Sequence, residues 1–163
     1  MRWFRFAVLI LIVTVLQAGL ADIFALAITK PDLLLILLVF FAIYSDTSEA
    51  IITSFTIGFA ADIIGSVMGP KIISFGLFGT LLAYLHRVIA IRKMPYQALA
   101  ISATGLLTGT LALLLTVLKG VPTAEKAFTM LLGTSLYSAV IGPFLFLPTA
   151  WWMHIKTHRF SHH

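Results

Sequence analysis

Apolar residues dominate the chain in long runs, and short polar segments interrupt them. The interruptions fall near residues 29–32, 45–49, 69–71, 86–95 and 119–123. Several of the runs approach about 20 residues, the length that an α-helix needs to cross the hydrocarbon core of a bilayer. The pattern predicts an all-α integral membrane protein, a compact bundle of about six transmembrane helices.

The interruptions divide the chain into six expected spans within a single transmembrane domain. The run from Leu33 to Tyr44 holds only about 12 residues, so as a helix it measures about 18 Å. This helix must be short, extend into its flanks or thin the bilayer locally. The expected spans are 6–28, 31–45, 49–68, 71–86, 95–118 and 124–153, followed by a basic tail at 154–163.

Proline and acidic residues mark where several of these helices begin or bend. Pro31 suits a first helical position, and Asp32 complements the positive start of the helix. Asp46 and Glu49 have the spacing of a capping box for the third helix. Pro143 lies inside the last expected span and should kink it.

Composition supports a membrane environment and argues against a soluble enzyme. The chain is 60% hydrophobic and 10% charged, whereas soluble domains carry about 25% charged residues. It has no cysteine, which excludes disulfides and thiolate chemistry. The basic start and first apolar run resemble a signal peptide, but the apolar stretch resumes after Asp22, so we expect no cleavage at 19–21.

The net charge of +5 reports membrane topology rather than nucleic-acid binding. With the N-terminus inside, seven positive residues fall in cytoplasmic segments and four in outer loops, which predicts that both termini are cytoplasmic. The first group is Arg2, Arg5, Arg87, Arg92, Lys93, Lys156 and Arg159, and the second is Lys30, Lys71, Lys119 and Lys126.

Small residues line one face of several expected helices. Gly58, Asp62, Gly65 and Gly69 recur at helical spacing, and Gly105 with Gly109 forms a GxxxG pattern. Such faces allow close helix approach, either within the chain, which we favour, or against a partner or a second copy. The candidate positions are Pro31, Asp32, Gly58, Asp62, Gly65, Gly69, Gly76, Gly79, Gly105 and Gly109.

Asp62 is the one acid well inside an expected span. A charged carboxylate at mid-membrane costs at least ~2.5 kcal/mol, so it must face the bundle or stay protonated. Proton or ion relays use several such groups, and no second one lies at mid-depth. Structural hydrogen bonding is therefore favoured over transport.

No residue pattern predicts an enzyme, a cofactor or a metal site. The chain lacks a glycine-rich phosphate loop, paired catalytic carboxylates and a convergent Ser-His-Asp set. His154 and His158 have the spacing of two helical metal ligands. With His162 and His163 they fit better as a solvated cytoplasmic tail or the remnant of an added tag.

Three motifs resemble the family of rod shape-determining protein MreD. They are Pro31-Asp32-Leu33, opening an early helix, the glycine-rich stretch from Gly58 to Asp62, and Met68-Gly69, where leucine-glycine is usual. The polar turn at 46–49 departs from the basic or glycine-rich turn of that family.

The resemblance implies a non-catalytic inner-membrane component of the bacterial elongation machinery. Its partners would be MreC and, in a larger complex, the MreB filament, RodA and a penicillin-binding peptidoglycan synthase. The resemblance also implies a fold similar to the substrate-binding subunits of energy-coupling-factor transporters. Two alternatives stay open: a vitamin-binding subunit of such a transporter, although the expected outer loops offer few polar or aromatic residues, and a proton-coupled channel or transporter based on Asp62.

Overall fold

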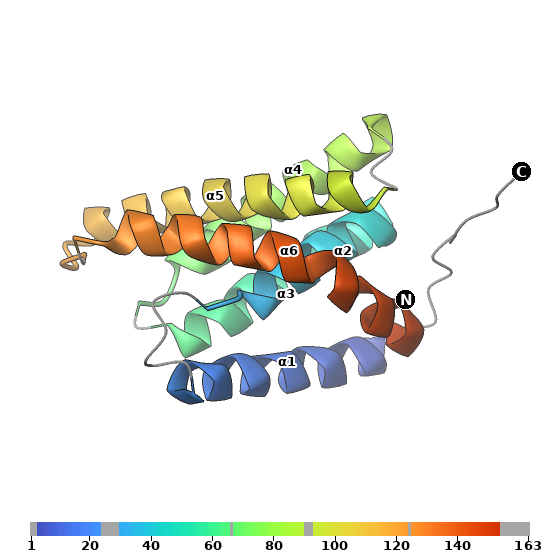
Figure 1. Ribbon diagram of the computed structural model, residues 1–163, viewed down its shortest axis with the longest axis horizontal. Coiled ribbons are helices and arrows are strands. Elements are labelled where there is room, and N and C mark those ends of the chain that lie inside the picture. Colours follow the sequence, from blue (N-terminus) through green and yellow to red (C-terminus); the bar gives the residue numbers. More distant parts are fainter. Residues whose placement is uncertain (1–2, 24–29, 66, 90–92, 124, 154–163) are drawn as a thin grey trace, which may run out of the picture.

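Six helices form the part of the chain that the computed structural model describes, namely residues 3–23, 30–65, 67–89, 93–123 and 125–153. They run alternately up and down through one bundle (Figure 1). The predicted all-α bundle of about six helices is confirmed. The helices are α1 (Trp3–Ile23), α2 (Leu33–Tyr44), α3 (Thr47–Ile64), α4 (Pro70–Val88), α5 (Met94–Leu118) and α6 (Ala127–Met153).

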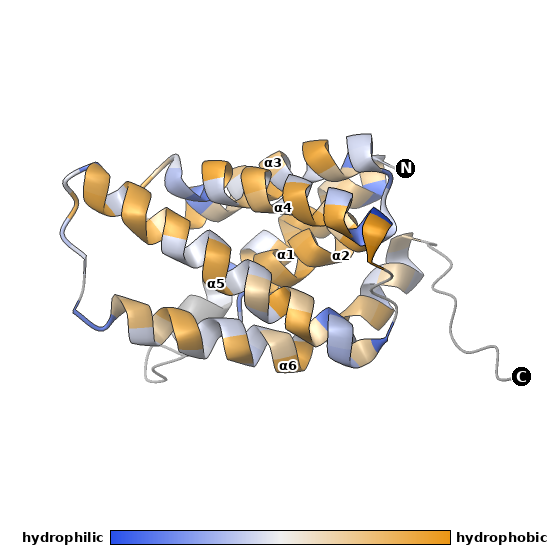
Figure 2. Ribbon diagram, turned by 90° about the horizontal axis from the view of Figure 1, so that it is seen from above, coloured by the Kyte–Doolittle hydropathy of each residue, from blue (hydrophilic) through white to orange (hydrophobic). Residues whose placement is uncertain are grey.

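The helices have the composition of a membrane protein. Within the described residues, α3, α5 and α6 are long and apolar enough to cross a membrane by length and composition alone. Hydrophobic residues make up most of the helices, and the most hydrophilic ones lie near helix ends and in turns (Figure 2). α6 contains Pro143 and Pro148 and changes direction in its C-terminal half (Figure 1), because proline removes a helical hydrogen bond.

α2 is the core of the bundle. Every residue from Leu34 to Ile43 is buried, and α2 contacts each of the other five helices. A helix that is hydrophobic on all sides is one that protein surrounds. α2 is short, with 12 residues. The helix stops at Tyr44, because the backbone of Ser45 already has a β conformation.

Several helix boundaries differ from the expected spans. α3 ends at Ile64 rather than 68, because Gly65 is its C-cap and α4 begins at Pro70. α6 begins at Ala127 rather than 124. Asp46 holds the N-cap position of α3, but its side chain makes no capping hydrogen bond, so the predicted capping box is incomplete. The segment 24–28 and the histidine tail (His154, His158, His162 and His163) lie outside the described residues.

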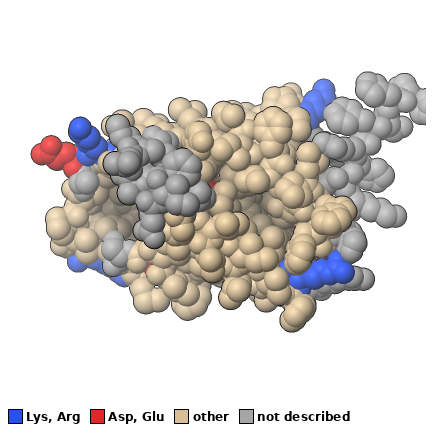
Figure 3. Space-filling model, turned by 60° about the horizontal axis from the view of Figure 1, so that its bottom comes forward, with Lys and Arg blue, Asp and Glu red and all other residues tan. Residues whose placement is uncertain are grey.

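Charged residues separate to the two ends of the bundle. We call the end where α2, α4 and α6 begin the lysine end, because it carries Lys30, Lys71, Lys119 and Lys126. The opposite end carries Arg5, Arg87 and Lys93. Between the ends the visible face is almost free of charge (Figure 3), which is the arrangement that suits a bundle embedded in hydrocarbon.

Candidate functional site

The start of α2 is tied to two other helices. Asp32 caps α2, because its Oδ1 accepts a hydrogen bond from the Leu35 N–H at 3.1 Å. The backbone N–H of Asp32 donates to Ser138 Oγ of α6 at 2.8 Å. The Leu33 N–H donates to Gln17 Oε1 of α1 at 2.8 Å. The Pro31-Asp32 opening therefore joins α1, α2 and α6 at the lysine end.

Asp62 connects the end of α3 to the start of α4. Its side chain is 1% exposed. Oδ2 accepts hydrogen bonds from the N–H groups of Gly69 and Ile72 at 2.8 and 3.0 Å, and Oδ1 accepts one from the Lys71 N–H at 3.1 Å. A helix start leaves such donors unpaired and carries a partial positive charge. The carboxylate supplies both the acceptors and the complementary charge.

The turn between α3 and α4 needs glycine at position 69. Gly69 has a φ of 113°, which side-chain-bearing residues rarely adopt. A Cβ there would also lie 2.9 Å from Lys119 Nζ, and that ammonium donates a hydrogen bond to the Met68 carbonyl. Gly65 is exposed and faces only its own helix end. The turn thus joins α3, α4 and the end of α5.

Glycines bring α3 and α4 into close contact. A Cβ on Gly58 would lie 2.8 Å from Ile72 Cα, so the backbones of the two helices touch there. On α4, Gly76 packs directly against the Phe55 ring and Gly79 against Ser54. These small residues are used inside the chain.

Glycines also set the contact between α5 and α6. A Cβ on Gly105 would lie 2.9 Å from Ser135 Oγ. Gly109 packs directly against the Leu131 side chain. The GxxxG pattern of α5 therefore faces α6.

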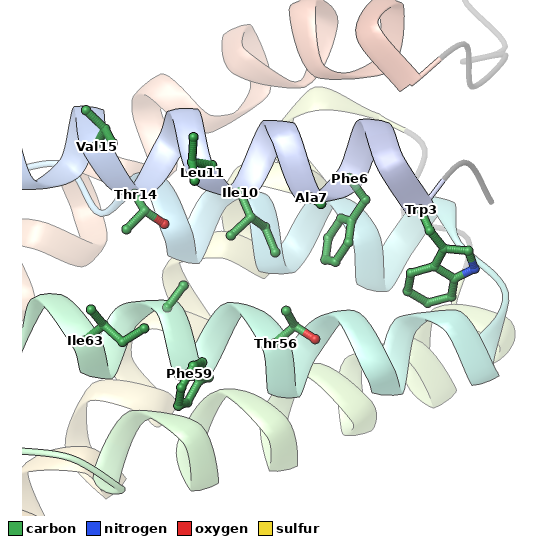
Figure 4. A pocket seen from close by; sticks show the side chains of 11 residues that line it. Trp3, Phe6, Ala7, Ile10, Leu11, Thr14, Val15, Thr56, Phe59 and Ile63 are labelled. Atoms are coloured by element: carbon green, nitrogen blue, oxygen red, sulfur yellow. The ribbon is translucent and has the colours of Figure 1, made fainter.

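An apolar groove lies between α1 and α3 on the outside of the bundle. Its volume is about 560 Å³. Phe6, Ile10 and Thr14 of α1 point toward α3 across it, and Thr56 of α3 points toward α1 (Figure 4). We call it the α1–α3 groove. Its lining is Trp3, Phe6, Ala7, Ile10, Leu11, Thr14 and Val15 of α1 with Thr56, Phe59, Ala60 and Ile63 of α3.

Several supporting polar residues escape sequence analysis. Ser138 and Lys119 bind backbone groups 106 and 51 positions away. Gln97 Nε2 donates to the Tyr44 hydroxyl at 2.8 Å, 53 positions away, and so ties α5 to the end of α2. The one signal for these residues is a polar side chain within or beside an apolar run, and that signal does not identify a partner.

The side chains described above pack helices together and form hydrogen bonds that hold helix ends. In the described segments no three His, Cys, Asp or Glu residues come close enough together to hold a metal ion. Asp32 and Asp62 both accept backbone N–H groups at helix starts. Their oxygens stabilise the fold at the lysine end.

These features define a class of protein: a small helical membrane protein whose polar groups fix helix ends and whose outer surface is apolar. Residues 1–155 match the family described as rod shape-determining protein MreD, and the chain belongs to this family. Membership makes it a shape-determining structural component with a role in the rod-shape complex. Searches of curated proteins and of solved structures find no match.

Proposed function

We propose that this chain is a non-catalytic scaffold of the inner membrane that binds MreC and links cytoskeletal filaments to peptidoglycan synthesis. Family membership supports the rod-shape role, and the α1–α3 groove carries the binding part of the proposal. MreB, RodA and a penicillin-binding synthase would join through the larger complex.

The groove offers an apolar surface on which part of a transmembrane helix can pack. Its α1 wall repeats at helical spacing from Trp3 to Val15, which is about 18 Å along the axis. Its lining is almost entirely apolar, with the hydroxyls of Thr14 and Thr56 as its polar groups. Helices associate in lipid through close van der Waals packing and occasional hydroxyl hydrogen bonds. A single-span partner is the occupant that fits these features.

The charge distribution supports one orientation. Seven positive residues lie in or beside the segments at the α1 start, the α4–α5 turn and the tail, against four at the lysine end. By the positive-inside rule both termini face the cytoplasm and the lysine end faces outward. A partner helix in the α1–α3 groove would then run beside α1 from the cytoplasmic side.

Affinity purification from native membranes in mild detergent tests the proposal. Ala7→Trp fills the groove, whereas Ala18→Trp places the same bulk on an exposed position of α1 outside it. We expect MreC to co-purify with the parent chain and with Ala18→Trp, and its yield to fall at least about tenfold with Ala7→Trp, as for loss of a central packing contact.

Equal recovery of MreC with both variants would remove the groove from the proposal. Recovery of an ATPase-containing transporter module in place of MreC would favour the vitamin-binding alternative instead.

A further inference from the structure

A second cavity lies at the lysine end, separate from the α1–α3 groove. It has a volume of about 410 Å³ and lies between α2, the start of α4, α5 and α6. Small-molecule sites typically measure about 300–1,000 Å³. We call it the lysine-end cavity.

Two neighbouring hydroxyls of α6, those of Thr134 and Ser135, line this cavity. Ser135 is 1% exposed and lines the cavity, and Gly105 leaves the space in front of its Oγ. Within the described residues, neither the Ser135 nor the Thr134 hydroxyl forms a hydrogen bond. Ser135 is buried and Thr134 is partly buried, and a hydroxyl that faces such a cavity is satisfied by water or by a bound molecule. The hydroxyls therefore point to a ligand with hydrogen-bond acceptors.

The lysine-end cavity also has a cationic side chain in its lining. Lys71 lines it, and its ammonium forms no ion pair with a described residue. Asp32 lines the cavity as well, but its carboxylate accepts the Leu35 N–H. Of the helices that begin at this end, α2 and α4 have their starts capped by the carboxylates of Asp32 and Asp62. Lys71 is therefore the group in the lining that can bind an anion.

The remaining wall is apolar and accepts a hydrocarbon body. Leu35, Phe75, Leu113, Met130 and Leu131 line it from four helices. An apolar wall with a few convergent polar groups is the usual design of a small-molecule site.

We propose that the lysine-end cavity binds a phosphate-bearing amphiphile. Lys71, Ser135 and Thr134 donate to the phosphate oxygens, and the apolar wall takes the hydrocarbon part. Phosphate offers several strong acceptors to these donors. The phosphate can belong to a membrane lipid or to a soluble alkyl phosphate, and the proposal does not depend on MreC binding.

Two probes separate the sources. Hexyl phosphate serves as the soluble probe, with binding measured by titration calorimetry on the purified full chain. Phosphatidylglycerol serves as the lipid probe. The chain is reconstituted in phosphatidylcholine nanodiscs that contain phosphatidylglycerol as the minority lipid, and native mass spectrometry measures how much of it the chain retains. Melting temperatures of all variants confirm that each is folded.

Two matched pairs of variants test the site. Thr134→Phe fills the cavity and removes a donor, whereas Thr129→Phe adds the same ring at an exposed position of α6. Lys71→Gln removes the cavity cation, and Lys126→Gln removes an exposed one. We expect saturable binding of at least one probe, a loss of affinity of about tenfold with Lys71→Gln, and a larger loss with Thr134→Phe. The two control variants should bind like the parent chain.

Binding of hexyl phosphate alone assigns a soluble ligand, and retention of phosphatidylglycerol alone assigns a lipid. The proposal is overturned if the parent chain binds neither probe, or if folded Thr134→Phe and Lys71→Gln bind as well as their controls.

Discussion

Asp62 shows how an acid is accommodated inside an apolar bundle. Three backbone N–H groups surround its carboxylate, and its side chain is 1% exposed. Charged hydrogen bonds of this kind contribute more than neutral ones, and the donors are costly when left unpaired. The residue therefore stabilises the α3–α4 turn.

Replacing Asp62 with alanine should destabilise the protein. Asp62→Ala leaves three N–H groups without their acceptor, and we expect a loss of about 2–4 kcal/mol in the free energy of unfolding. Asp46→Ala is the control, because Asp46 is exposed and makes no capping hydrogen bond. Thermal unfolding in detergent measures both. An Asp62→Ala variant as stable as Asp46→Ala would contradict the stabilising role.

The sequence indicated which single residues stand out, but not what they bind. Asp62 was evident as an isolated acid, but the sequence did not show that its partners are the N–H groups 7 to 10 positions ahead. Ser138 and Gln17 hold the start of α2 across 106 and 16 positions. Such pairings depend on how helices pack, and that information is absent from local spacing.

At the scale of elements, α3 and α4 pack with almost no space between their backbones. Gly58 lies where the two helices touch. Gly19 of α1 has no neighbouring atom within 4 Å of its hypothetical Cβ. The two glycines therefore offer the same substitution in opposite environments.

Gly58→Ala should force α3 and α4 apart and cost about 1–3 kcal/mol. Gly19→Ala should be neutral or stabilising, since alanine favours the helix. Melting temperatures of the two purified variants, compared with the parent chain, distinguish these outcomes. A Gly58→Ala protein with an unchanged melting temperature would show that the contact relaxes freely.

Helix number and type followed from the apolar runs, whereas helix ends did not. Pro31-Asp32 and Gly69-Pro70 marked two starts only to within one or two residues: α2 begins at Leu33 rather than 31, because Asp32 is its N-cap, and α4 begins at Pro70 rather than 71. The end of α3 was placed four residues late, at 68, since nothing in its apolar run shows that Asp62 turns back to cap the next helix.

At the scale of the whole molecule, the proposed orientation makes a direct prediction. The chain has no cysteine, so single cysteines report topology without background. Thr123→Cys lies at the lysine end and Ser48→Cys at the opposite end, and both positions are exposed. In spheroplasts, a membrane-impermeant maleimide should label Thr123→Cys at least about tenfold faster. Faster labelling of Ser48→Cys would reverse the orientation.

The central position of α2 also bears on how the chain is made. α2 leaves the ribosome early, yet its enclosure is completed by α5 and α6, which are synthesised last. Until then the nascent α2 must rest against lipid or an assembly factor. Closure of the native core therefore waits for the final quarter of the polypeptide, and a chain truncated before α6 should be recognised by membrane quality-control proteases.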